Sequence, residues 1–456
     1  MFLTNDQKNA VNNINKFLKN DTQIYYLLDG SAGTGKTHLM KTLFSESNNV
    51  ILAAPTHKAA KVLSKKVDKR VYTIHQILKY KAKYNNNGDT IFYQDKETNG
   101  KCIYLNNDIP DVRDFNVDES YIIVIDEASM ISEELFNKLI KINNKILFIG
   151  DHYQLPPVNE LESKVFNFVK NKSTLIEIVR TGNNLELANI HNFFRNCVKN
   201  IDIPKEEFRK LISKPKIFLK KIDKCLKNNQ EFVITCYTNE RRREWIRYCI
   251  SRLQYFYNTM EEYIPSMQLI LMSTLLYDDI ILHKFDTFII KQVEKQIISI
   301  KELGEINYFN LERGITIYKL TCIDLEEQTR IFYKVISKDY QYFMTKAIEK
   351  KKIIKGWIKK SEESKKQIQE LWTEYWNNFN KYETYLTPYF AITIHSSQGS
   401  TIEKVFVDWY DIFFNQKKRK RIGNMKEKCQ LCYVAVSRSS KKINILAQKL
   451  DIDEYN

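Results

Sequence analysis

The chain has 456 residues, 43% hydrophobic and 12% aromatic, and its 71 lysines and arginines outnumber its 55 aspartates and glutamates, for a formal charge of +16. This composition excludes a disordered tail, and the length predicts two to four domains with sizeable cores. Eight cysteines spread over this length do not indicate a disulfide scaffold. The basic surplus indicates either a polyanionic partner or a lysine-rich solvated surface.

Targeting and membrane signals are not expected in this sequence. Its most apolar stretch, 267–283, is interrupted by Asp278 and Asp279, whereas a membrane span needs about 20 apolar residues. The first eight residues contain no apolar run of the kind that a secretory signal requires. We therefore expect a protein that is not secreted and has no membrane partner. Its expected location is intracellular, in the cytoplasm, or in the host cytoplasm if the source is viral.

Only 12 residues are glycine, and three of them fall within six residues near the start of the chain. An apolar run at 24–28 precedes them and predicts a buried strand, and the pattern that follows predicts a helix with an apolar face. Between these elements the sequence fits G-x-x-x-x-G-K-[ST], the P-loop pattern. The residues that carry this pattern are Gly30, Gly33, Gly35, Lys36 and Thr37.

The residue types of a P-loop suit phosphate binding. Glycines let successive backbone N–H groups turn toward one phosphate, and the N-terminus of the helix adds partial positive charge. Lys36 is expected to contact the β- and γ-phosphates of ATP, and the Thr37 hydroxyl is expected to ligate Mg²⁺.

A second acidic element follows the apolar run 121–125. Asp126 and Glu127 come directly after this predicted strand. We expect Asp126 to hold Mg²⁺, and Glu127 to polarise the attacking water as a general base.

Further along the chain, strands alternate with helices, which predicts parallel α/β sheets. Strands are expected at 50–54, 145–149, 232–236, 389–394, 405–408 and 442–446, and helices at 57–66 and 430–436. Residues 280–345 alternate β-branched and aromatic residues, which predicts short antiparallel strands, as in a small barrel. Residues 346–383 are lysine-rich and indicate helix.

The order of these motifs resembles that of superfamily 1 helicases of the RecD-like group, and most closely the phage Dda type. The resemblance implies two RecA-like P-loop cores with parallel sheets, a small hairpin inserted in the first core, and an SH3-like β-barrel with a helical extension inserted in the second. The implied first core comprises 1–78 and 119–178, and 79–118 form the hairpin or pin. The implied second core comprises 179–250 and 385–456, and 251–384 form the barrel and helices.

The resemblance also assigns nucleotide-binding residues. It implies that Gln7 reads adenine, that Gln154 senses the γ-phosphate, and that Arg180 and Arg438 act as arginine fingers. Gln398 and Gly399 fall in a further motif at the nucleotide. A guanidinium suits the finger position because it donates a bidentate fork to the charge that spreads over the γ-oxygens.

The strand-binding motifs follow the same resemblance. Residues implied to line the single-strand path are Pro55, Thr56, His57, Thr73, His75, Thr393 and His395. The sequence departs from the relatives at Ser396, where they often carry lysine, and at Ser437, where threonine is usual. Val179 replaces an aromatic residue that stacks on adenine in some relatives.

Other features allow more than one interpretation. Phe92, with Tyr93 as the alternative, is either the wedge of a pin that splits the duplex or a packing residue of its own subdomain. Basic runs at 346–366 and 417–421 suit either phosphate contacts or solvated loops. The aromatic residues at helical spacing in 372–382 favour packing over base stacking, and Cys429 and Cys432 are expected to be core residues.

The sequence therefore predicts an ATP-dependent DNA helicase that uses ATP and Mg²⁺ and translocates on single-stranded DNA. Its direction, 5′-to-3′, is implied by the resemblance alone. Expected partners are single-stranded DNA, single-strand/duplex junctions, and replication, recombination or repair proteins, and a monomer is expected. An RNA helicase or translocase, a P-loop switch with a partner that is not a nucleic acid, and a binding module with an inactive ATPase site remain alternatives.

Overall fold

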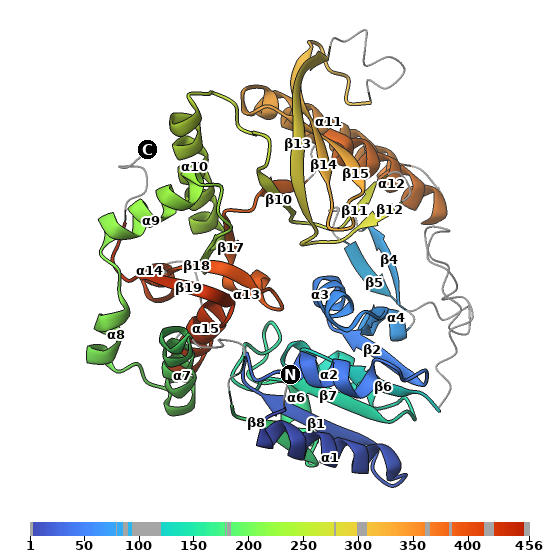
Figure 1. The fold of residues 1–456 in the computed structure, drawn as a ribbon. Helices are drawn as coiled ribbons and strands as arrows, with labels where there is room; N and C mark the ends of the chain where they lie inside the picture. The colour runs from blue at the N-terminus through green and yellow to red at the C-terminus, as the bar shows by residue number, and fades with distance from the viewer. Residues whose placement is uncertain are drawn as a thin grey trace. The chain divides into compact units, whose positions relative to one another are not determined.

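The computed structural model describes residues 3–78, 80–84, 90–93, 120–177, 179, 184–277, 280–298, 308–360, 365–382, 385–414 and 424–450. The chain forms two compact units, each assembled from separated segments (Figure 1). Unit 1 comprises 1–79, 114–259 and 390–456, and unit 2 comprises 80–113 and 260–389. Within the described ranges, no helix combines the length and apolarity needed to cross a membrane.

Unit 1 contains a six-stranded parallel sheet, which with its helices we term the first core. Its strand order is β3-β2-β6-β7-β1-β8. The strands are β1 (Tyr25–Gly30), β2 (Val50–Ala54), β3 (Val71–Thr73), β6 (Ile122–Ile125), β7 (Ile146–Gly150) and β8 (Lys172–Leu175). The helices are α1 (Asn5–Lys19), α2 (Lys36–Phe44), α3 (His57–Val67), α4 (Ile74–Ile77), α5 (Glu133–Leu139) and α6 (Lys164–Phe168), with a 3₁₀ turn at Ala128–Met130.

Both faces of this sheet are buried, as parallel strands with continuous apolar sequences require. Successive residues of one strand supply different cores. Leu28 packs with Ala10 and Phe17 of α1, whereas Leu27 belongs to the cluster that contains Phe136 of α5. Because β1, β6 and β7 pair in parallel, their carboxyl ends lie at one edge of the sheet. The P-loop and the acidic pair follow these ends.

The second core of unit 1 is a four-stranded parallel sheet with the order β17-β9-β18-β19. Its strands are β9 (Val233–Cys236), β17 (Ala391–Thr393), β18 (Ile402–Asp408) and β19 (Ser439–Leu446). The helices that follow or precede them are α7 (Leu185–Asn200), α8 (Lys205–Leu211), α9 (Pro215–Lys227), α10 (Asn239–Tyr257), α13 (Ile394–Ser397), α14 (Trp409–Phe413) and α15 (Met425–Ser437).

Unit 2 is built on a five-stranded antiparallel sheet with the order β15-β14-β13-β10-β16. Its strands are β10 (Gln268–Leu271), β13 (Thr287–Ile298), β14 (Ile315–Ile323), β15 (Thr329–Val335) and β16 (Leu386–Pro388). The prediction of short strands is wrong for β13, which has 12 residues, because its pairing with β14 continues past a bulge at Ile290 and Gln292. Two hairpins, β4 (Lys81–Tyr84) with β5 (Thr90–Tyr93) and β11 (Leu275–Tyr277) with β12 (Ile280–Leu282), complete the strands.

Two helices, α11 (Ser337–Lys360) and α12 (Lys365–Tyr382), accompany the antiparallel sheet. The aromatic stripe of α12 is buried: Trp372 is 2% exposed, and Trp376 and Phe379 are each 5% exposed. These rings pack with Phe343 of α11 and Ile317 of β14 in the core of unit 2. This arrangement confirms packing and leaves these rings no open face for a base.

The fold class predicted from the sequence is confirmed: two parallel α/β sheets with an antiparallel insertion and a small hairpin. The division into four domains stays a prediction, since both parallel sheets fall in one unit. Seven described cysteines, Cys429 and Cys432 among them, are buried thiols without a disulfide partner. No cluster of ligands suited to a metal ion occurs in the described ranges.

Candidate nucleotide-hydrolysis site

The P-loop connects Gly30, the last residue of β1, with Lys36, the first of α2. Gly33 and Gly35 both adopt φ near +86°, a conformation that L side chains rarely take. A Cβ on Gly35 would lie 2.5 Å from Nε2 of Gln7. The Lys36 ammonium donates hydrogen bonds to the carbonyl groups of Gly30 and Ser31, so the loop surrounds its own lysine.

Gln7 reaches this loop from α1. A capping box with Thr4 holds its side chain at the start of the helix, and the amide oxygen accepts from the Thr4 N–H at 3.0 Å. Its Nε2 donates to the Thr34 carbonyl at 2.9 Å. Gln7 is 3% exposed, so burial and these two hydrogen bonds hold its amide beside the P-loop without help from a ligand.

The acidic pair follows β6, as the sequence predicts. The Glu127 N–H donates to Oδ1 of Asp126 at 2.9 Å, and Glu127 itself has φ near 55°. Burial and the neighbouring Glu127 carboxylate raise the pKa of Asp126 to about 6, against the lowering effect of Lys36 and Lys66. A bound divalent cation would relieve this cost, because positive charge favours a buried carboxylate.

Gln154 lies in the loop that follows β7. Its Nε2 donates to Oδ2 of Asp151 at 3.4 Å, which orients the amide. Its Oε1 is buried and finds no hydrogen-bond partner among the described residues. A buried polar atom of this kind usually has a water or ligand partner. Asp151 is 0% exposed, and burial raises the pKa of its carboxyl group.

The second core contributes Gly399 and Arg438 to the same region. Gly399 has φ near +74°, and a Cβ on it would lie 3.7 Å from the Ala59 Cβ and 4.0 Å from Oε1 of Glu127. Arg438 follows the last residue of α15 and is 3% exposed. Its guanidinium donates to the Val434 carbonyl at 3.2 Å and to the Ser437 hydroxyl at 2.9 Å.

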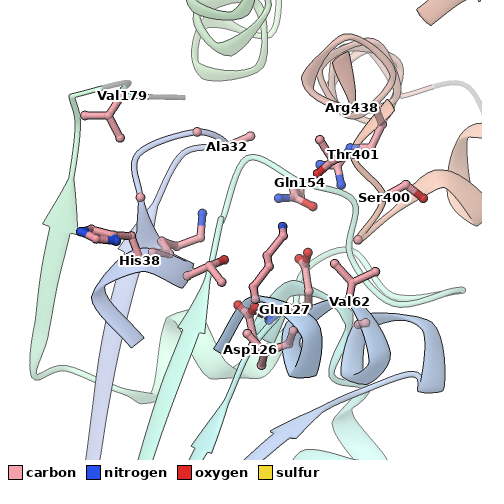
Figure 2. Close-up of a pocket in the computed structure, with 18 of the residues that line it drawn as sticks. Ala32, His38, Val62, Asp126, Glu127, Gln154, Val179, Ser400, Thr401 and Arg438 are labelled. Atoms are coloured by element: carbon pink, nitrogen blue, oxygen red, sulfur yellow. Dashed lines mark hydrogen bonds between the residues drawn. The ribbon is translucent and has the colours of Figure 1, made fainter. Parts of the chain in front are cut away.

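These residues line one cavity of about 340 Å³. Figure 2 shows Asp126 and Glu127, Gln154 and Arg438 projecting toward it from different elements. Residues predicted for the nucleotide site that line it are Gln7, Gly33, Gly35, Lys36, Thr37, Asp126, Glu127, Gln154, Gly399 and Arg438. The cavity therefore combines a phosphate loop, two carboxylates, two amides and a guanidinium.

Two described residues predicted for the nucleotide, Gly30 and Gln398, are not among the residues that line this cavity. Gly30 lies at the base of the loop, where a Cβ would meet Oγ1 of Thr34 at 2.8 Å. Gln398 is 8% exposed and donates from Nε2 to the Leu155 carbonyl at 3.4 Å. Arg180 lies outside the described residues, whereas Val179 lines the cavity and donates its N–H to the Gly33 carbonyl at 2.8 Å.

The threonines predicted to bind single-stranded DNA occupy equivalent positions in the fold. Thr56, Thr73 and Thr393 each occupy the N-cap position where a parallel strand turns into a short or longer helix. Thr56 accepts from the Ala59 N–H, and Thr73 from the Gln76 N–H. Pro55, directly before Thr56, is buried. Hydroxyls and helix N-termini of this kind suit phosphate contacts.

The predicted histidines follow these caps. His57 and His75 are half-buried, and burial is the largest of the effects on the pKa of His75, which is lowered. The His395 ring lies 6.0 Å from the ring of Tyr237. Contact between these three histidines and single-stranded DNA stays a prediction.

The structure describes only some of the other residues that the sequence suggests as DNA contacts. In the hairpin, Phe92 pairs with Ala82 and Tyr93 pairs with Lys81, and their side chains lie outside the description. The basic run 417–421 also lies outside it. In the other run, Lys346 is paired with Glu312 at 2.6 Å and Glu349 at 3.3 Å, so its charge is partly compensated.

The hydrogen bonds that join the two cores were not predicted from the sequence. The Tyr433 hydroxyl bonds to Asp151 and to the Ala32 N–H. Lys58 of α3 donates to the Ser396 carbonyl at 2.9 Å, and burial, with the charge of Arg438, lowers its pKa to about 7. The available signal for Tyr433 was a lone hydroxyl in the otherwise apolar run 431–436.

Sequence comparison finds relatives for parts of the chain. Residues 2–202 match a family of AAA domains. An uncharacterised protein of Acanthamoeba polyphaga mimivirus, R530, is 32% identical over 231 residues, which cover 44% of this chain and 44% of the relative. The ATP-dependent DNA helicase Dda of Enterobacteria phage T4 is 34% identical over 173 residues, which cover 36% of this chain and 35% of Dda. The chain thus spans less than half the length of these curated relatives.

Comparison of structures covers the whole fold. The crystal structure of Bacteroides Pif1 bound to single-stranded DNA superposes with a TM-score of 0.51 and 15% sequence identity, over 99% of this chain and 94% of that one. At this identity the likeness concerns the fold.

Two parallel α/β cores with a P-loop cavity, together with an antiparallel insertion, give this chain the fold seen in the Pif1 structure. Part of its sequence is similar to the Dda helicase, and its fold is similar to that of Pif1.

Proposed function

We propose that this protein is an ATP-dependent DNA helicase that translocates along single-stranded DNA in the 5′-to-3′ direction. The observation that carries the proposal is the composition of the cavity. Its phosphate loop and carboxylates come from the first core, and Gly399 and Arg438 come from the second. A nucleotide held there would contact both cores, so its hydrolysis would change the contacts between them.

The residues in the cavity suit ATP and Mg²⁺. Gly33 and Gly35 adopt the left-handed backbone that lets successive N–H groups of the loop turn toward a phosphate, and Lys36 supplies positive charge. Thr37 and Asp126 would hold the Mg²⁺, which neutralises charge on the β- and γ-phosphates when bound. Gln7 would hydrogen-bond the base.

The hydrolytic residues have distinct tasks in this proposal. Glu127 would accept a proton from the attacking water, and Gln154 would orient that water by accepting a hydrogen bond from it with Oε1. Arg438, and Arg180 by resemblance, would stabilise the charge that develops on the γ-oxygens. Arg438 would first have to exchange its bonds to Val434 and Ser437 for bonds to phosphate.

Single-stranded DNA is proposed as the track. The helix N-termini at Thr56, Thr73 and Thr393 would bind the phosphates of the DNA strand, with His57, His75 and His395 beside them. Phe92 on the hairpin is the proposed wedge. Relatives named DNA helicases, and a fold shared with a Pif1 that was crystallised with single-stranded DNA, support this choice of polymer.

The decisive experiment uses duplexes with a single-stranded tail at either the 5′ or the 3′ end, in DNA and in RNA. We expect ATP-dependent unwinding of the DNA duplex with the 5′ tail. Unwinding only with a 3′ tail would refute the direction, and equal stimulation of ATPase activity by RNA would favour an RNA translocase. An ATPase that nucleic acid does not stimulate would favour a P-loop switch.

A further inference from the structure

One hydroxyl group joins three motifs that are far apart in the sequence. Tyr433 lies on α15 of the second core and is 1% exposed. Its oxygen accepts a hydrogen bond from the N–H of Ala32, in the P-loop, at 2.9 Å. The same hydroxyl donates to Oδ2 of Asp151, in the loop after β7, at 2.8 Å. Both partners belong to the first core.

The partners of this hydroxyl are themselves buried and connected to the cavity. Asp151 is 0% exposed and Ala32 is 7% exposed. The Asp151 carboxylate also accepts a hydrogen bond from Nε2 of Gln154. The other polar atom of that amide, Oε1, has no partner among the described residues. The direction in which Gln154 points into the cavity therefore depends on a carboxylate that Tyr433 holds in place.

A second contact reinforces the first. Gln430 lies three residues before Tyr433, so the two side chains share one face of α15. Its Nε2 donates to the backbone carbonyl of Gln154 at 3.0 Å, and Gln430 is 4% exposed. The helix that ends beside Arg438 thus contacts both the side-chain support and the backbone of Gln154.

We infer that the Tyr433 hydroxyl is a positioning group that transmits the state of the P-loop to Gln154 and to α15, and through α15 to Arg438. This inference rests on the proposed ATPase function. Movement of the Ala32 N–H toward a phosphate would weaken its bond to the hydroxyl, and the bond from the hydroxyl to Asp151 would change with it. Tyr433 is not among the residues that line the cavity, so it acts through Gln154 and Arg438.

The buried position makes this connection sensitive to loss of a single atom. Phenylalanine at position 433 would keep the ring packing, but the Ala32 N–H would lose its hydroxyl acceptor. Asp151 would lose the hydroxyl donor and keep the Tyr153 N–H and Nε2 of Gln154 as donors. Loss of a buried hydrogen bond favours conformations in which the groups find other partners. Rotation of Asp151 would break its hydrogen bond with Nε2 of Gln154. The expected effect is therefore on turnover and on communication between the cores, more than on nucleotide binding.

The test compares Tyr433→Phe with Tyr248→Phe in the full chain. Tyr248 is also buried and also bonds an aspartate, Asp223, at 3.2 Å, but it lies on α10, opposite α9, and does not line the cavity. We expect Tyr433→Phe to lower kcat for DNA-stimulated ATP hydrolysis at least tenfold and to change the Kd of a fluorescent ATP analogue less than threefold. Tyr248→Phe should leave both close to wild type.

Hydrogen exchange gives a readout that does not depend on turnover. In the wild type, a non-hydrolysable ATP analogue should slow amide exchange in the P-loop and in α15. In Tyr433→Phe the P-loop should remain protected, while α15 loses its nucleotide-dependent protection. If Tyr433→Phe does not fold, Gln430→Met removes the second contact and should reduce the protection of α15.

The outcomes separate the two proposals. A wild-type protein that does not hydrolyse ATP refutes the proposed function. An active wild type whose Tyr433→Phe variant retains kcat and α15 protection refutes the inference alone. A variant that loses stability to the same extent as Tyr248→Phe, with normal kcat, assigns Tyr433 to packing and refutes it as well.

Discussion

Substitution of Gly35 by alanine should disturb the nucleotide site through Gln7. The new Cβ would lie 2.5 Å from Nε2 of Gln7 and 3.3 Å from a methyl carbon of Val179. The Gln7 side chain would have to move, and its hydrogen bond to the Thr34 carbonyl, 2.9 Å long, would break. Thr34 is 0% exposed and Gln7 is 3% exposed, so neither group could readily find water in exchange.

Two costs determine the magnitude. Alanine in the left-handed conformation at φ near +86° costs about 1–2 kcal/mol. Loss of a buried hydrogen bond that leaves its partner unmet costs about 1–3 kcal/mol. We therefore expect Gly35→Ala to lower the free energy of unfolding by about 2–5 kcal/mol in all, and to weaken ATP binding because Gln7 leaves its position.

The assay is chemical denaturation followed by circular dichroism, together with titration of a fluorescent nucleotide. Gly356→Ala is the control, because nothing lies within 4 Å of a Cβ there, toward the C-terminal end of α11. That substitution should raise stability by about 0.5–1 kcal/mol. In a Gln7→Ala background, Gly35→Ala should cost only the backbone strain, about 1–2 kcal/mol.

Two results would refute this reasoning. The first is an equal cost of Gly35→Ala in the wild type and in the Gln7→Ala background, which would show that Gln7 does not carry the effect. The second is unchanged nucleotide affinity in Gly35→Ala, which would separate the glycine from the site.

Three further predictions address the base, a titrating pair and the core of unit 2. Glu127→Gln should reduce kcat for ATP hydrolysis by about 10²–10⁴-fold with nucleotide affinity retained, and full turnover would overturn its assignment as the base. Burial disfavours the charged form of His152, but Asp29, 2.6 Å away, outweighs it and raises the pKa above 6.5. The stabilisation by this pair should therefore be complete below pH 6.5 and disappear as the pH rises through the raised pKa. The unfolding free energies of wild type and His152→Gln should accordingly converge as the pH rises above the raised pKa of His152, and a gap that widens with pH would contradict the assignment. Phe343→Ala, at a fully buried position of α11, should cost about 3–5 kcal/mol, whereas Trp357→Ala on the same helix, 64% exposed, should change the denaturation midpoint little.

Local chemistry explains what could be predicted from the sequence. The P-loop and the Asp126–Glu127 pair follow apolar strands, and their geometry depends on neighbours within a few residues. Gly33 and Gly35 were identifiable because a tight loop needs the left-handed backbone that glycine tolerates. The alternation of strands and helices likewise predicts parallel sheets, because such connections must cross over.

Long-range packing explains what could not be predicted. Which face of α15 meets the first core depends on residues some 280–400 positions away, so the contacts of Tyr433 with Asp151 and Ala32 have no local signature. The same limit applies to Gln398, whose amide bonds the Leu155 carbonyl. The length of β13 escaped prediction because strand pairing, and not the strand's own pattern, determines where it ends.

The order of strands in the second core has a consequence for synthesis of the chain. The six-stranded sheet is complete once Leu175 has been made, whereas β9 pairs with β17 and β18, which follow the long segment of unit 2. About 150 residues separate β9 from β17, a delay on the order of 10–30 s at typical rates of translation. A nascent chain would therefore hold a finished first core while β9 waits with unpaired edges, and chaperones that shield such edges would act in that interval.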